Sequence, residues 1–228
     1  MCKGRDDDDF ALLEAWRRGD RVAGAVLFER HYECVARFFH NKVSEEAQED
    51  LLHDTFEGCL KAVARFRGQA RFRNFLFAIA RNVLAEHLRR RQRRQARTGP
   101  EVDLEETPAA DFGLSPVGAA IQHEEQRLLL EALRHIPLIH QITLELHYWE
   151  ELTTEDIAEV LGIPVGTVRA RLRDGRAHLQ EQIRKIASSP EMLESTLDNL
   201  DEWARRVRDH LGANPVNGGR RCRTGGVK

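Results

Sequence analysis

Apolar residues recur at intervals of three and four along most of the chain, which is the period of an α-helix, and no stretch shows the alternation of a strand. Phe10, Leu13 and Trp16 predict a short first helix that breaks near Gly19. A second helix is expected over residues 21–43. Its apolar stripe consists of Val26, Leu27, Tyr32, Val35 and Phe39.

Two further helices should complete an N-terminal domain, residues 1–97. Ser44 can cap the third, which is acidic at its start and should end near Phe66, because residues 67–69 are typical of a loop. The fourth is expected from about 70 to 95. The core faces are predicted to be Leu51, Leu52, Thr55, Phe56, Leu60 and Val63 on the third helix, and Phe72, Leu76, Ile79 and Val83 on the fourth. Phe75 lies one position off the last stripe, so it can sit at the edge of the core or outside it.

The rest of the chain divides into three parts. Prolines, glycines and acids without periodicity mark residues 98–121 as a linker. Residues 122–187 form a second, smaller helical domain, and residues 188–228 an extension with a helix at about 190–211 and a disordered tail. The predicted fold class is all-α: two small helical domains joined by an acidic flexible linker, plus a helical extension.

The second domain contains a helix-turn-helix pattern. Thr153 or Thr154 can cap a helix that Gly162 ends in the left-handed conformation, and Pro164 can open the next helix at its first position. The exposed face of that helix should carry Thr167, Arg169, Arg171, Arg173 and Arg176. This arrangement favours DNA binding in a major groove over the alternative, a plain helical hairpin with a charged outer face.

Charge is strongly segregated, although the formal net charge is only −2. Residues 61–97 hold twelve bases and one acid, a net charge of +11, whereas residues 98–125 hold seven acids and no base. A solvated helix face would mix both signs, so the basic segment indicates a polyanionic partner. Phenylalanines interleaved with its arginines suit unstacked bases.

Other classes of protein are not supported by the sequence. It has no apolar run of about 18 residues and its start lacks a signal-peptide core, so we expect a cytoplasmic protein without membrane insertion. The cysteines are scattered and are expected to be free thiols; they are Cys2, Cys34, Cys59 and Cys222. The absence of HExxH spacing, phosphate-cradling glycines and nucleophile motifs argues against an enzyme, a metal site or a cofactor.

Two segments carry a family resemblance. Residues 50–94 resemble the second domain of the extracytoplasmic-function (ECF) subgroup of bacterial RNA polymerase sigma factors, and residues 152–179 resemble their fourth domain. The resemblance spans roughly residues 10–187. It implies a factor that binds core RNA polymerase, recognises the −35 promoter element as duplex, and recognises and melts the −10 element. It also implies contacts with the clamp coiled coil of the largest polymerase subunit and with the flap, and an anti-sigma partner.

The resemblance assigns roles to individual residues. Docking on the clamp is implied for Asp50, Leu51, His53, Asp54 and Phe56. Recognition and melting of the −10 element are implied for Arg67, Arg71, Phe72, Asn74, Phe75, Arg81, Asn82 and His87, with Phe72 favoured as a core residue. Phosphate anchoring is expected of Arg89, Arg90, Arg91, Arg93 and Arg94, and −35 recognition of the five residues on the exposed helix-turn-helix face.

Departures from the family pattern lie in the second domain. Ile139, His140 and Gln141 stand where relatives usually carry a basic triplet, and Asp174 and Gly175 where they commonly carry Arg and Ala. We therefore expect modest affinity for the −35 element.

Two alternative functions remain. One is a helix-turn-helix regulator that binds an operator, and the other is a sigma mimic that titrates an anti-sigma factor. The regulator leaves the basic segment and the acidic docking helix unexplained, and the mimic could dispense with the basic segment.

Overall fold

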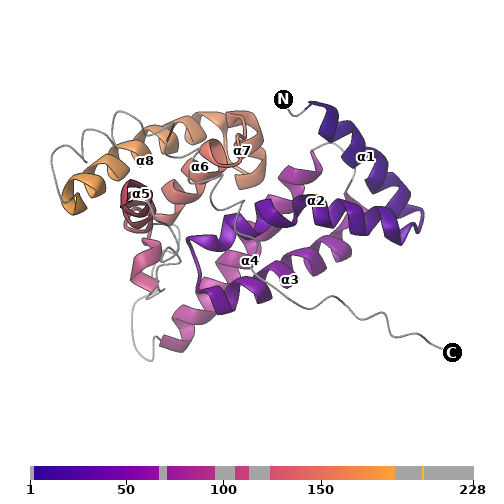
Figure 1. Cartoon of the computed structure of the whole chain (residues 1–228), viewed down its shortest axis with the longest axis horizontal. Helices are drawn as coiled ribbons and strands as arrows, with labels where there is room; N and C mark the ends of the chain where they lie inside the picture. Colours follow the sequence, from indigo (N-terminus) through magenta and orange to yellow (C-terminus); the bar gives the residue numbers. More distant parts are fainter. Residues whose placement is uncertain (1–2, 67–70, 96–105, 113–123, 188–201, 203–228) are drawn as a thin grey trace.

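The computed structural model describes these residues of the chain: 3–66, 71–95, 106–112, 124–187 and 202. Within these ranges the regular structure is helical apart from one isolated bridge between Pro108 and Pro137, which agrees with the predicted all-α class (Figure 1). Arg67, most of the predicted linker and nearly all of the extension 188–228 lie outside the described residues.

Four helices form the N-terminal unit: α1 (Lys3–Arg17), α2 (Arg21–His40), α3 (Glu45–Ala62) and α4 (Phe72–Gln95), with a 3₁₀ turn at Val63–Arg65. Gly19, at φ +100°, makes the turn between α1 and α2 in a conformation that favours glycine. The Asp20 carboxylate then caps α2 by accepting from the backbone N–H groups of Val22 and Ala23. Ser44 stands at the N-cap of α3, as predicted, but its side chain makes no capping hydrogen bond.

The apolar stripes of the first three helices are narrower than helical spacing predicts. Leu13, Leu27, Val35 and Phe39 are fully buried. Leu60 was predicted to lie on the core face but is 52% exposed, so that prediction was wrong. Val26 and Tyr32 of the α2 stripe are 39% and 42% exposed, and Phe10 of α1 is 52% exposed. Helical spacing marks the side of a helix that is apolar, but the neighbouring helices decide how wide a strip they cover.

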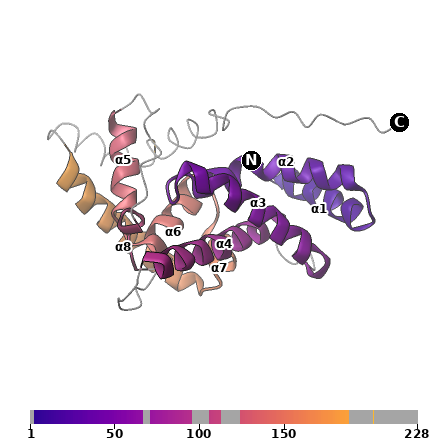
Figure 2. The ribbon, with the colours of Figure 1, turned by 90° about the horizontal axis from the view of Figure 1, so that it is seen from below.

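Helix α4 buries a wider face than predicted. Phe72 is a core residue, as expected, and Leu76 is buried beside it. Ile79 and Val83 are only partly buried. Buried instead are Phe77, Ala80, Leu84 and Leu88. Figures 1 and 2 show the reason, because α4 lies between α3 on one side and the C-terminal helices on the other.

The C-terminal unit contains α5 (Glu124–Arg134), α6 (Leu138–Tyr148), α7 (Thr154–Leu161) and α8 (Val165–Ile186). Thr153 caps α7 in a capping box with Asp156, and Gly162 ends it in the left-handed conformation at φ 66°. Both features were predicted. Pro164 is the N-cap residue of α8 rather than its first helical residue, one position from the prediction.

Helices α6 and α8 approach closely at Gly175. A Cβ atom there would lie 3.1 Å from the Cβ of His140 and 3.3 Å from Cδ1 of Leu144. The glycine that weakens α8 as a helix former therefore allows α8 to pack against α6.

The two units are packed against one another. Helix α4 contacts α7, and α2 contacts α6 (Figure 2). The Asn41 side chain, just after α2, donates to the carbonyl of Leu130 at 3.1 Å, and Gln141 donates back to the carbonyl of Asn41 at 3.3 Å. In the described part of the linker, a 3₁₀ turn at Ala109–Phe112 also contacts α4.

Candidate nucleic-acid interface

The basic end of α4 presents its arginines to solvent. Four of the five predicted phosphate anchors, Arg89, Arg90, Arg93 and Arg94, are exposed, and Arg91 is half-buried. Glu86, the acid of this segment, forms ion pairs with Arg90 at 2.9 Å and with Arg93 at 3.2 Å. These pairs are exposed and weak, so phosphate groups can compete for the same guanidinium groups.

A groove of about 780 Å³ runs between α3 and α4. Its α3 wall carries acidic and apolar side chains and its α4 wall carries mainly polar and basic ones. The lining residues are Asp50, Leu51, Asp54, Ile79, Asn82, Val83, Glu86, His87, Arg90, Arg91 and Arg94. The fold thus brings three of the predicted polymerase-docking residues close to two residues predicted to read the −10 element and to three predicted phosphate anchors. Their spacing in the sequence alone does not predict this proximity.

The pKa of His87 is lowered inside this groove, which favours the neutral imidazole. Burial lowers its pKa, and the charges of Arg91 and Arg94 lower it further. Its Nε2 atom is buried, and none of the described residues hydrogen-bonds to it. A neutral imidazole can donate to or accept from a base edge, which suits the predicted reading role.

The predicted docking residues on α3 divide into two groups. Asp50, His53 and Asp54 are exposed. Leu51 is 4% exposed, and the half-buried Phe56 packs with its ring centroid 4.8 Å from that of Phe28. The three exposed residues can meet a partner protein directly, whereas Leu51 and Phe56 pack inside the N-terminal unit and hold α3 in place.

At the start of α4, two of the predicted melting residues, Arg71 and Asn74, contact the C-terminal unit. Asn74 is 1% exposed, and its amide donates to Asp156 Oδ1 at 2.8 Å and to Glu159 Oε2 at 2.7 Å. Arg71 donates to the second oxygen of Asp156 at 3.1 Å. Phe75 is half-buried, with its ring 4.5 Å from that of Phe66. Three of these side chains thus have protein partners where the resemblance implies DNA.

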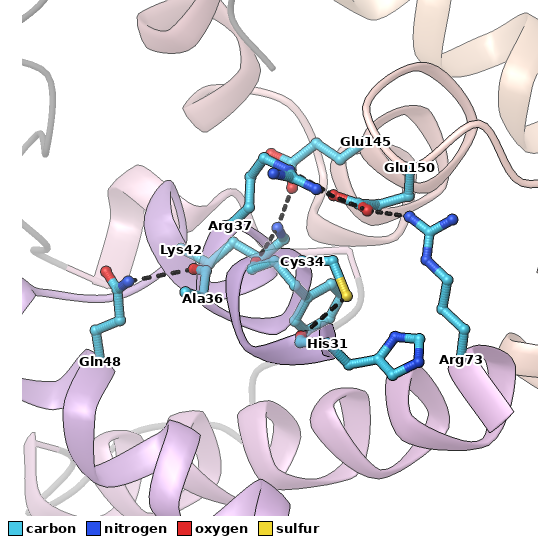
Figure 3. A network of polar contacts seen from close by, with 10 residues as sticks. His31, Cys34, Ala36, Arg37, Lys42, Gln48, Arg73, Glu145 and Glu150 are labelled. Carbon is cyan, nitrogen blue, oxygen red and sulfur yellow. Dashed lines mark hydrogen bonds and ion pairs between the residues drawn. The ribbon is translucent and has the colours of Figure 1, made fainter. Parts of the chain in front are cut away.

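A buried ion-pair network lies next to these contacts (Figure 3). Glu150, whose side chain is 3% exposed, accepts from Arg37 at 2.7 and 3.1 Å and also from Arg73 of α4. The Arg73 guanidinium stacks over Phe77 at 5.4 Å. Cys34 lies below this network, and burial raises the pKa of its thiol to about 12. This cysteine is therefore an inert core residue.

Lys42 and Glu145 form a second buried ion pair between the units (Figure 3). Gln141 donates to the other oxygen of Glu145 at 2.9 Å. Burial raises the pKa of Glu145 and lowers that of Lys42, so each needs the other to stay charged. Sequence reasoning missed both pairs. The available signal was the position of Arg37 and Lys42 within or beside apolar stretches, where an unpaired charge would be costly.

On α8, the predicted −35 residues lie on two sides of the helix. Arg169, Arg173 and Arg176 are exposed, and Thr167 is half-buried. Arg171 instead lines a groove of about 300 Å³ between the units, together with Arg81, Asn82 and Arg89 of α4. The five residues therefore do not share one face.

The three exposed arginines among the predicted −35 residues all have local partners. Arg169 forms an exposed ion pair with Glu155 at 3.7 Å. Asp174 pairs with Arg173 at 2.8 Å, and the hydroxyl of Tyr148 accepts from Arg176 at 2.6 Å. All three contacts are exposed, so DNA phosphates could replace them.

Neither a metal site nor a membrane-spanning helix is present among the described residues. No group of three or more histidine, cysteine, aspartate or glutamate side chains there could hold a metal ion. Among the same residues, no helix is long and apolar enough to cross a bilayer.

Comparison with known proteins adds independent findings. Residues 27–94 match the family model described as Sigma-70 region 2, and residues 126–179 match the one described as Sigma-70, region 4. Together these segments span more than half of the chain.

Curated relatives include an ECF RNA polymerase sigma-E factor of Haemophilus influenzae, 28% identical over 186 residues, which are 78% of this chain and 96% of the relative. The RNA polymerase sigma-H factor of Pseudomonas aeruginosa is 29% identical over 188 residues, with coverage of 79% and 96%.

Solved structures share the fold. One is CnrH in complex with the cytosolic domain of CnrY, with a TM-score of 0.56 and 21% identity, covering 79% of this chain and 99% of that one. Another is the sigma factor RpoE in complex with the anti-sigma factor NepR from Bartonella quintana, with a TM-score of 0.54 and 22% identity, covering 74% and 98%.

Proposed function

The chain belongs to the ECF subgroup of sigma-70 factors, which direct transcription initiation, and on that premise we propose how its two units divide the promoter. Helix α4 binds the −10 element, and the exposed face of α8 binds the −35 element. The observation that carries the proposal is the pair of basic helices on separate units, α4 with exposed arginines after Leu88 and α8 with Arg169, Arg173 and Arg176.

The −10 element is bound along α4. Its exposed C-terminal arginines hold phosphates, Asn82 and His87 meet base edges in the groove, and the start of the helix contacts the opened strand. Phe72 and Asn74 are buried in the described arrangement, so the melting role falls first on Arg67, Arg71 and Phe75.

Core polymerase binds through α3. Its exposed acids, Asp50 and Asp54, suit a basic-rimmed coiled coil. An anti-sigma factor is a further proposed partner. Two structural neighbours were each determined with a bound second protein, one of which is named as an anti-sigma factor.

Reconstitution with core polymerase on a randomised promoter library tests this division of roles. We expect enriched promoters with two conserved elements. Arg169→Ala should lower transcription about five- to a hundred-and-fifty-fold, because one lost base contact costs about 1–3 kcal/mol. Arg184→Ala is the matched control, because it removes the same charge from α8 about 22 Å further along the helix at 1.5 Å per residue. Transcription that is equally sensitive to both changes, or library promoters without a second element, would refute the division of roles.

A further inference from the structure

The groove of about 300 Å³ between the two units has both apolar and basic lining residues. Its apolar residues come from both units and include Leu88 of α4 and Ile142 of α6, and Arg81, Arg89 and Arg171 line the same groove. An apolar pocket of this size with a few converging polar groups is typical of small-molecule sites. We propose that the groove binds a small amphipathic carboxylate, a single carboxylate on a short alkyl chain. This site does not rest on the proposed promoter contacts.

The basic rim of the groove selects an anionic head group. Three arginines and one acid, Glu86, line the groove, which gives the lining a net formal charge of +2. Glu86 forms its ion pairs with Arg90 and Arg93, neither of which lines this groove. Guanidinium groups bind carboxylates through two parallel, charge-assisted hydrogen bonds. A singly charged carboxylate suits this rim better than a doubly charged phosphate, because Glu86 would repel the second charge.

The floor of the groove selects an alkyl chain. Leu84 and Leu88 are each 1% exposed, and Leu161 is 5% exposed, so these side chains have little contact with bulk water. Apolar cavities hold water poorly and bind apolar molecules instead. At roughly 30 Å³ per non-hydrogen atom, the share of one water molecule in the liquid, the groove holds about ten such atoms. Octanoate, with eight carbons and two oxygens, is therefore a suitable probe.

Other occupants fit this groove less well. An α-helix with its side chains is about 10–12 Å across, which is too wide for a space of about ten atoms. A nucleic-acid strand would place polar sugars and phosphates against the leucine floor, where they would lose water without gaining hydrogen-bond partners. An alkyl carboxylate instead leaves its charged oxygens at the arginines and its chain on the floor.

Methyl NMR of the full chain locates the site. Octanoate is titrated into protein with labelled isoleucine δ1 methyl groups, without DNA or polymerase. Ile139 and Ile142 line this groove, whereas Ile79 lines the groove between α3 and α4 and reports on binding there. We expect saturable shifts of the Ile139 and Ile142 signals and none of the Ile79 signal. Shifts that do not saturate, or that affect Ile79 instead, would overturn the proposal.

A ligand series separates the two halves of the recognition. Each methylene removed should weaken binding about fourfold, so hexanoate should bind about fifteenfold more weakly than octanoate. Octanamide keeps the chain but has no charge, and it should bind about five- to tenfold more weakly. Acetate at equal concentration controls for ionic strength. Equal binding of octanoate and acetate would exclude the apolar floor as a site, and equal binding of octanoate and octanamide would exclude the basic rim.

Arg89→Gln and Arg94→Gln are matched variants. Each removes one charge from an exposed position of α4, but only Arg89 lines this groove, whereas Arg94 lines the groove between α3 and α4. Arg89→Gln should weaken octanoate binding about five- to tenfold through the loss of charge-assisted hydrogen bonds, and Arg94→Gln should leave it unchanged. Equal effects of the two changes would show binding to positive charge alone and would refute the site.

Ala85→Phe fills the groove without a change in charge. Ala85 lines the groove, and phenylalanine adds six non-hydrogen atoms to a space for about ten, so octanoate binding should be lost. Circular dichroism checks that the variant is folded. In the wild-type chain, octanoate at ten times its Kd should raise the melting temperature by about 3–6 °C, because it binds the folded state. Full octanoate binding by folded Ala85→Phe would overturn the proposal, whatever the outcome of promoter-dependent transcription.

Discussion

Gly175→Ala tests how closely α8 packs against α6. A methyl group there would meet His140 Cβ at 3.1 Å and Leu144 Cδ1 at 3.3 Å. The first of these atoms is one bond from the backbone, so relief requires that one helix shift. Overpacking of this kind costs about 1–3 kcal/mol. Alanine gains up to about 1 kcal/mol in helix propensity over glycine. We therefore expect a net loss of about 1 kcal/mol.

Gly166→Ala is the matched control because it lies in the same helix, where an added Cβ has nothing within 4 Å. It should keep the propensity gain and stabilise the chain. Thermal unfolding followed by circular dichroism should show melting temperatures that move in opposite directions, by about 2–4 °C per kcal/mol for a chain of this size. A rise in melting temperature for Gly175→Ala equal to that for Gly166→Ala would refute the close approach.

Three further predictions concern single residues. Gly162→Ala should lower the free energy of unfolding by about 1–2 kcal/mol in urea, because φ is 66° there, and an unchanged value would contradict this conformation. His87 has a pKa lowered by burial and by Arg91, so the unfolded chain binds its proton more tightly. Stability should therefore fall as the pH drops below 6.5, and this loss should shrink in His87→Gln; equal pH dependence would exclude the effect. Asp174→Asn should free Arg173 and steepen the salt dependence of duplex binding by about 0.9 for one added phosphate contact; an unaltered slope would show that Arg173 does not reach DNA.

Local signals in the sequence were enough to predict most elements. Thr153, Gly162 and the apolar spacing predicted α7 and its turn, because caps and left-handed glycines act within a few residues. The boundaries of α2 and α4 came within about three residues of the prediction for the same reason. These features depend on neighbours along the chain rather than on the final packing.

Contacts between the units could not be predicted in the same way. Arg37 and Glu150 are 113 residues apart, and Lys42 and Glu145 are 103 apart. No periodicity links such positions, and an arginine in a helical stripe has many possible acidic partners. The same limit applies to Asn74, for which the family resemblance implies a DNA contact. Its partners on α7 are apparent only in the fold.

The buried pairs also bear on how strongly the two units are packed together. A buried ion pair such as Lys42–Glu145 contributes little net stability over an apolar pair, because desolvation offsets most of its Coulomb energy. Loss of one partner is nevertheless costly, because the other charge is then buried without a partner. The pair therefore contributes more to fixing how the two units are oriented than to the free energy of their packing. The linker of residues 98–121 can reach about 80 Å at about 3.5 Å per residue, more than the roughly 55–60 Å of a 16–17 base-pair spacer at 3.4 Å per step. A packing of the units that is specific in geometry but modest in free energy is therefore compatible with the proposed function, in which the units separate to contact both promoter elements.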